Sequence, residues 1–160
     1  MPVILEGLAL AFWLVLICVV CIAKGPAAMA AFYEKDVQQR VADLGLATKE
    51  ELKKESGIAF LAMFLPVFFA VPAVVYLYNG VNGFMDGFLQ MAAVYLIAGL
   101  FDRIFIDEWW VCRTKVWIIP GTEDLMPYIP VKVKIKKWVG TVVGFTVLAA
   151  IIAGILQLVR

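Results

Sequence analysis

The sequence lacks histidine altogether, and it holds only three cysteines among its 160 residues. Histidine is the commonest protein ligand of transition metals, a usual axial ligand of haem and the side chain that changes charge near neutral pH. Its absence argues against a haem protein, a histidine-based zinc enzyme and an imidazole proton shuttle. No cofactor is indicated, and the side chains that remain for binding a metal ion are carboxylates and thiols.

A strong excess of charge of either sign is also missing. The chain has 14 basic and 13 acidic residues, which gives a net charge of +1. Nucleic-acid-binding domains usually carry a marked basic excess. We therefore expect no nucleic acid among the partners, and the position of the charges is more informative than their sum.

Long apolar stretches are what the sequence has in abundance. Hydrophobic residues make up 64% of the chain, and the mean hydropathy is +0.93. Four apolar stretches cover residues 3–23, 58–78, 84–106 and 138–159. Each is close to the ~20 residues that a helix needs to cross a bilayer. The pattern predicts an all-α integral membrane protein, in which residues 1–160 form one domain built as a four-helix transmembrane bundle.

Basic residues are concentrated in two of the three connections. They are absent from residues 79–83, and only Arg160 follows the last stretch. The first and third connections carry most of them: Lys24, Lys35, Arg40, Lys49, Lys53, Lys54, Arg113, Lys115, Lys132, Lys134, Lys136 and Lys137. Cytoplasmic loops are enriched in lysine and arginine. This asymmetry predicts a multi-pass protein of the cell membrane with both termini outside the cytoplasm.

The first long connection has the pattern of a helical hairpin. Gly25 and Pro26 interrupt the first apolar stretch, and residues 27–44 have helical periodicity. Gly45 suits the end of a helix, and Thr48 with Glu51 has the spacing of a capping box. We expect the helix that begins at Thr48 to continue into the second membrane span. The hairpin would then lie on the cytoplasmic surface.

The third connection is open to two interpretations. Within residues 131–136, valine and isoleucine alternate with lysine, which is the period of a half-exposed strand. Residues 120–124 have turn chemistry, so a small strand-like hairpin or an irregular connection is one expectation. Alternatively, Pro130 starts the fourth helix and residues 131–137 are its first turns. In both cases the lysines are expected to contact anionic lipid headgroups at the cytoplasmic face.

Small residues recur at intervals of four in the last apolar stretch. Gly140 and Gly144 form a GxxxG pattern, and Gly154 follows at compatible spacing. Such residues let helix backbones approach closely in a membrane. The pattern predicts helix packing, either within the chain or with a second copy or another membrane protein.

The most unusual segment is the charged run at the end of the third apolar stretch. Arg103 and Asp107 are four residues apart and are expected to pair along a helix. On an α-helix Asp102 lies on another face, where its expected partner is Arg113 or a lysine. The alternative is a belt of charges at the membrane surface, anchored by the neighbouring tryptophans.

If this run forms a site, its residue types limit the chemistry. The candidate catalytic residues are Asp102, Asp107 and Glu108, and the candidate substrate-binding residues are Arg103, Arg113 and Lys115. Carboxylates that converge would suit a divalent cation, and the basic groups would suit a phosphate.

Two classes of function follow from these features. The first is a small polytopic protein that acts through oligomerisation, partner binding or passage of a small solute. The second is an interfacial enzyme that acts on a lipid or a phosphorylated substrate at the cytoplasmic face. Convergence of the charged side chains on one cavity would favour a site over a surface anchor.

Overall fold

The computed structural model describes residues 2–159, and this part of the chain contains helices and connections but no strand. Four helices are long and apolar enough to cross a membrane: Pro2–Ala23, Lys49–Tyr78, Phe84–Val111 and Val131–Val159. The prediction of an all-α four-helix bundle with membrane-spanning helices is therefore confirmed.

Three of the long helices change their winding along their length. The first long helix is α1 (Pro2–Ala23), which is α-helical throughout. The second long helix consists of α3 (Lys49–Leu65), η2 (Pro66–Ala70), α4 (Val71–Ala73) and η3 (Val74–Tyr78). The third consists of α5 (Phe84–Phe101) and η4 (Asp102–Val111), and the fourth consists of α6 (Val131–Val139), η7 (Gly140–Gly144) and α7 (Phe145–Val159). The segments η2, η3, η4 and η7 are π-helical. The connections contain η1 (Pro26–Phe32), α2 (Lys35–Asp43), η5 (Lys115–Trp117) and η6 (Glu123–Leu125).

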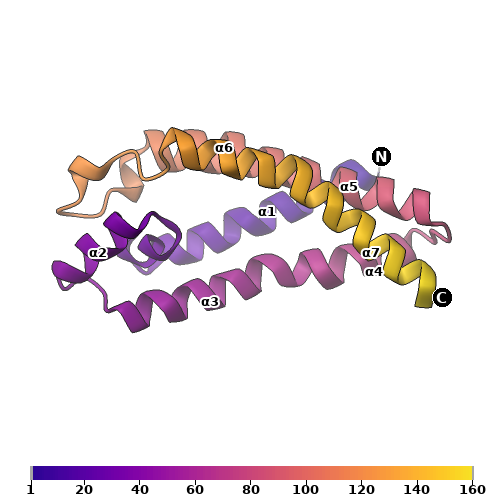
Figure 1. The fold of residues 1–160 in the computed structure, drawn as a ribbon, viewed down its shortest axis with the longest axis horizontal. Coiled ribbons are helices and arrows are strands. Elements are labelled where there is room, and N and C mark those ends of the chain that lie inside the picture. Colours follow the sequence, from indigo (N-terminus) through magenta and orange to yellow (C-terminus); the bar gives the residue numbers. More distant parts are fainter. Residues whose placement is uncertain (1, 160) are drawn as a thin grey trace.

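The four long helices run lengthwise beside one another (Figure 1). Both termini lie at one end of the bundle, together with the turn at residues 79–83 (Figure 1). We call this the terminal end. The opposite end carries α2 and the connection at residues 112–130, and we call it the loop end.

Glycines bring α1, α5 and the fourth helix close together. A Cβ atom built on Gly7 of α1 would lie 2.7 Å from both Cβ and Cγ2 of Ile97 on α5. A Cβ on Gly99 of α5 would lie 2.6 Å from Cγ2 of Thr141. Real Cβ atoms do not approach this closely, so these contacts depend on glycine. Close approach through small residues is the usual way in which membrane helices pack.

The glycines of the GxxxG pattern are not at these contacts. A Cβ built on Gly140 or Gly144 would meet no neighbouring atom within 4 Å, and one on Gly154 would lie 3.9 Å from Phe84. The fourth helix thus approaches α5 opposite Gly99 rather than through its own GxxxG pair. Helix packing through Gly140 and Gly144 stays a prediction. Its partner would be a second copy of the chain or another membrane protein.

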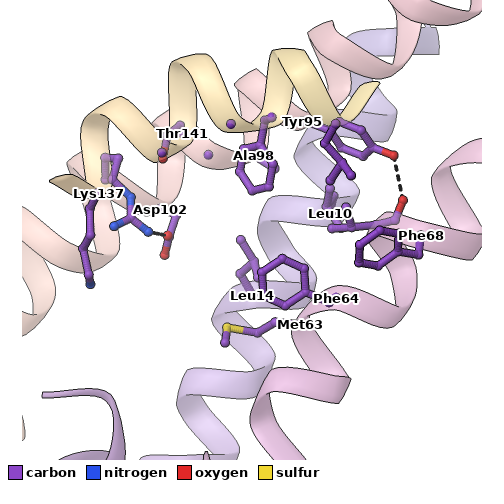
Figure 2. A pocket seen from close by; sticks show the side chains of 17 residues that line it. Leu10, Leu14, Met63, Phe64, Phe68, Tyr95, Ala98, Asp102, Lys137 and Thr141 are labelled. Carbon is purple, nitrogen blue, oxygen red and sulfur yellow. Dashed lines mark hydrogen bonds and ion pairs between the residues drawn. The ribbon is translucent and has the colours of Figure 1, made fainter. Parts of the chain in front are cut away.

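A tyrosine compensates for a proline in the second helix. In a π-helix the amide of residue i+5 donates to the carbonyl of residue i, and the Val71 amide follows this pattern by donating to the Pro66 carbonyl. In the same register the next carbonyl, that of Val67, faces Pro72, which has no N–H. The Tyr95 hydroxyl of α5 donates to this Val67 carbonyl at 2.6 Å (Figure 2). The bond therefore joins the second and third helices where the proline leaves an acceptor free.

The first connection confirms two predicted helix ends. The Thr48 side chain and the Glu51 side chain form a reciprocal capping box at the start of α3. Gly45 has a φ of 68° after α2, and the Leu46 amide donates to the Val41 carbonyl at 3.1 Å, which is a Schellman ending. The expected helix at residues 27–44 is divided, because the chain is extended at Tyr33 and Glu34 between η1 and α2.

The strand-like interpretation of the third connection is wrong. Residues 131–136 are the first turns of the fourth helix, and Pro130 is its N-cap. The Pro130 carbonyl accepts hydrogen bonds from the amides of Val133 and Lys134 at 2.9 and 3.0 Å. A half-buried strand would bury its apolar side chains, yet Val131 and Ile135 are 69% and 58% exposed. On this helix Val131 and Ile135 face outward, whereas Val133 packs against the core that includes Trp117 and Ile129.

We expect Gly7→Ala to destabilise the bundle, because the Cβ of Ile97 cannot move away by a change of rotamer. Overpacking of this kind costs about 1–3 kcal/mol, which lowers the melting temperature of a chain of this size by roughly 2–12 °C. The matched control is Gly144→Ala. Gly144 is also a helical glycine, but it has open space around it. Melting of the purified variants in detergent provides the measurement. Equal melting temperatures for the two variants would contradict the contact between α1 and α5.

Candidate functional site

The π-helical winding of η4 decides which charged side chains meet. Bonding from residue i to residue i+5 widens the helix, and π-helical segments are frequent at functional sites. Asp102 and Asp107 are five residues apart in this segment. They therefore face the same side of the helix, whereas an α-helix would have separated them.

Four side chains form a charged cluster: Asp102, Arg103, Asp107 and Lys137. One terminal nitrogen of Arg103 donates to Asp102 and the other donates to Asp107. Lys137 Nζ, from the start of the fourth helix, lies 3.0 Å from both carboxylate oxygens of Asp107. Charges in apolar surroundings are stable only when they are paired. The cluster satisfies this condition with two cations and two anions, and it joins the third helix to the fourth.

The predicted pair of Arg103 and Asp107 is present, but the expected partner of Asp102, which was Arg113 or a lysine, is wrong. Asp102 is bound by its neighbour Arg103 instead. Arg113 lies 3.1 Å from Glu108, and both side chains are well exposed. The physical reason is the wider helix of η4, which turns Asp102 toward Asp107 and leaves Arg113 on the outside.

The predicted site residues divide into two groups. Asp102, Arg103 and Asp107 lie in the charged cluster, whereas Glu108 points outward to Arg113 and to Lys134, whose Nζ is 2.5 Å away. Lys115 is exposed in η5. The three carboxylates thus do not converge, which was the condition for a divalent-cation site. Over residues 2–159, no three His, Cys, Asp or Glu side chains are grouped so as to hold a metal ion.

A cavity of about 560 Å³ lies between the four long helices and ends at the charged cluster. Figure 2 shows Leu10 and Leu14 of α1 and Phe64 of α3 around the same space, with Lys137 and Asp102 at one end of it. We call this space the first cavity. Its remaining walls are also largely apolar and include Val67, Ala98, Phe145 and Leu148. The first cavity therefore has a long apolar part and a short charged part.

The first cavity opens sideways through the bundle. Phe68 of η2 lines it and is 45% exposed, and Gly140 and Gly144 of η7 line it and are also exposed. The opening thus lies between the second and the fourth helix. Because these segments belong to the membrane-spanning helices, the opening faces the region where lipid chains lie. The absence of side chains at the two glycines widens it.

A second cavity of about 230 Å³ continues from the charged cluster toward the loop end. The two cavities share Met63, Asp102, Arg103 and Lys137 in their walls. The second cavity is also lined by both cysteines of the C-x-x-C pattern in α1 and by residues of the connections: Cys18, Cys21, Met29, Phe32, Tyr33 and Ile129. The charged cluster therefore stands at the junction of the two cavities.

Two polar atoms at the second cavity make no hydrogen bond with the part of the chain that the structure describes. They are the hydroxyl oxygen of Tyr33 and the Nε of Arg103, and both are buried. Burial raises the pKa of Tyr33 above its ordinary range, and the nearby Tyr128 acts in the same direction. The phenol therefore stays a neutral O–H group that can donate a hydrogen bond.

Sequence reasoning missed two residues of this site. Lys137 was assigned to a surface row of lysines, yet it binds Asp107 from 30 positions away in the sequence. Tyr33 was only one of the residues in the helix expected at residues 27–44. The sequence signal that could have identified Lys137 is its position directly before the last apolar stretch. No local signal distinguishes Tyr33, because its position depends on how the connection folds back.

We expect Asp107→Asn to be strongly destabilising, since it leaves Arg103 and Lys137 short of a negative partner in apolar surroundings. Breaking a buried pair in this way costs about 3–5 kcal/mol. The double variant with Lys137→Met should recover part of the loss. Glu108→Gln is the control, because exposed ion pairs contribute at most about 1 kcal/mol. Melting in detergent measures all of these variants, and an equal effect of Asp107→Asn and Glu108→Gln would contradict the cluster.

Comparison of the chain with protein-family models, with curated proteins and with solved structures finds no match. The charged cluster and the two cavities are therefore the features from which a function has to be inferred.

Proposed function

We propose that this protein binds an amphiphile taken from the lipid bilayer. The hydrocarbon chain of the ligand would lie in the first cavity, and its polar end would lie at the charged cluster. The observation that carries the proposal is the composition of the first cavity, which is apolar along most of its length and charged at one end.

The size and the opening of the first cavity support this ligand class. Its volume of about 560 Å³ lies within the range of roughly 300–1,000 Å³ that is typical of ligand sites. The opening beside Phe68, Gly140 and Gly144 faces lipid chains, so an amphiphile could move in sideways without leaving the membrane. Ionisable groups within membrane helices commonly mark such ligand paths.

This proposal belongs to the class of partner and small-molecule binding rather than to catalysis. The alternative of an interfacial enzyme has less support, because Glu108 lies apart from Asp102 and Asp107, and both of these carboxylates are held by Arg103. Oligomerisation is the competing explanation for the exposed glycines of η7, since a helix of a second copy would fit against the same opening.

The loop end is proposed to lie in the cytoplasm of a cell with both termini outside. The support is the concentration of lysine and arginine in the two long connections and in the adjoining helix ends. Lys132 and Lys136 of α6 are exposed and could contact anionic lipid headgroups there. The charged cluster would then be near the cytoplasmic side of the bundle.

Dodecyl phosphate is a suitable probe for amphiphile binding. Added to the protein in a neutral maltoside detergent, it is expected to raise the melting temperature in a concentration-dependent way, because a ligand of the folded state stabilises it. Gly144→Leu should abolish this rise by obstructing the opening of the first cavity. Lipid that is retained through purification, measured by mass spectrometry, should be lost from the same variant.

The control is Val143→Leu, which adds bulk to the neighbouring residue on an exposed face of η7 and should respond like the parent. If Gly144→Leu and Val143→Leu respond alike, the amphiphile proposal is wrong. A disulfide-linked dimer through Gly144→Cys, in a chain without its native cysteines, would identify a second copy as the occupant and would also overturn it.

Labelling of single cysteines tests the proposed orientation. In a chain whose native cysteines are replaced by alanine, Asn82→Cys should react with a membrane-impermeant thiol reagent in intact cells, and Glu50→Cys should react only after the cells are opened. Both positions are exposed, so burial does not affect the comparison. The reverse pattern of labelling would contradict both termini being outside.

A further inference from the structure

We propose that the second cavity is a site for an oxyanion of the phosphate type, bound through the Tyr33 hydroxyl, the Nε of Arg103 and the ammonium of Lys137. This inference rests on the proposed function, because it assigns the head of the amphiphile whose chain lies in the first cavity. The two cavities meet at the charged cluster, so one elongated ligand can occupy both.

Two residues that line this cavity each have a buried polar atom without a hydrogen-bond partner in the described chain. A polar atom that is buried without a hydrogen bond destabilises a folded protein, and the large majority of buried side-chain polar atoms have a partner. The Tyr33 oxygen and the Arg103 Nε lack one at the same cavity. A bound group placed between them would satisfy both atoms.

The unpartnered groups at the cavity determine which kind of atom a ligand has to supply. Arg103 Nε can only donate a hydrogen bond, and the ammonium of Lys137 has three N–H groups, of which the oxygens of Asp107 use two at most. The phenol of Tyr33 is a further donor. The carboxylates of Asp102 and Asp107 also border the cavity, but they already accept hydrogen bonds from Arg103. The two buried atoms without a partner can thus both donate a hydrogen bond, and their complement is a group rich in acceptor oxygens.

Tyr33 is held in place by contacts that do not use its hydroxyl. Its ring stacks on the ring of Tyr128, with centroids 4.6 Å apart and planes at 28°. Its amide donates to the Ala30 carbonyl at 3.0 Å, and its carbonyl accepts a hydrogen bond from the Gln38 side chain at 2.9 Å. The residue is only 7% exposed. The Tyr33 ring is therefore held firmly beside the cavity while its hydroxyl stays without a hydrogen bond to the described chain, which suits a binding group more than a packing group.

The size of the cavity agrees with a polar head rather than with one water molecule. Its volume of about 230 Å³ is several times the ~30 Å³ that a water molecule occupies in the liquid. Met29, Phe32 and Ile129 of the two connections contribute apolar walls to this cavity. Apolar surroundings lower the local dielectric, which strengthens hydrogen bonds to a charged group.

The test is Tyr33→Phe, which removes only the hydroxyl. Because this hydroxyl has no hydrogen-bond partner among residues 2–159, the variant should melt at the same temperature as the parent, or higher, when no ligand is present. The dissociation constant of dodecyl phosphate, from the concentration dependence of the melting temperature, should rise by about tenfold or more, as expected for a lost hydrogen bond to a charged group. The matched control is Tyr78→Phe, at an exposed tyrosine of the terminal end, which should bind like the parent.

Three comparisons separate the outcomes. If dodecyl phosphate binds Tyr33→Phe as tightly as the parent while Gly144→Leu still blocks it, the oxyanion site is wrong and the amphiphile function stands. If dodecanol binds as tightly as dodecyl phosphate, the head is not recognised as an anion and the inference is likewise overturned. If dodecyl phosphate does not bind the parent at all, the proposed function fails as well.

Inorganic phosphate distinguishes the two sources of this chemistry. We expect it to bind the parent more weakly than dodecyl phosphate does and to show the same loss in Tyr33→Phe, which would support a lipid head as the ligand. Inorganic phosphate could instead bind the parent as tightly as dodecyl phosphate does and still bind Tyr33→Phe more weakly. This result would support the oxyanion site but overturn its assignment to an amphiphile.

Discussion

The structure depends above all on the need to pair charges that lie within membrane helices. Arg103 binds two carboxylates at once, and Lys137 shares one of them. An unpaired charge in this position would cost several kcal/mol, so the third and fourth helices are held in the register that brings Asp107 to Lys137. The same pairing places polar atoms at the junction of two cavities. Structural stability and the candidate binding site therefore have one physical origin.

The bundle is closed on one side and open on the other, and small residues account for both. Gly7 and Gly99 let α1, α5 and the fourth helix come into direct contact, because a side chain at either position would collide with its neighbour. Gly140 and Gly144 have open space around them and border the first cavity instead. The second helix is joined to α5 by the hydrogen bond from Tyr95 to Val67, beside the same cavity. Glycine thus brings helices together in one part of the bundle and leaves room in another.

The connections at the loop end are part of the site rather than flexible links. They form a second hydrophobic core, in which Trp117, Ile119 and Tyr128 are fully buried. The Tyr128 hydroxyl accepts a hydrogen bond from the Ile119 amide at 2.9 Å, and its ring supports the ring of Tyr33. Tyr33 therefore packs against the core that the connections form, and it also lines the second cavity.

The sequence by itself determined the membrane-spanning class, the number of long helices, the helix ends at Gly45 and Thr48, and the pairing of Arg103 with Asp107. These features depend on composition or on residues near one another in the chain, for which hydrophobicity and capping chemistry are sufficient. The tertiary structure alone decided that Lys137 completes the cluster, that Asp102 and Asp107 face the same side, and that Tyr33 borders a cavity. It also assigned residues 131–136 to a helix. The physical reason is that burial and charge pairing act between distant segments, and their gain outweighs local patterns such as the alternation of valine and lysine.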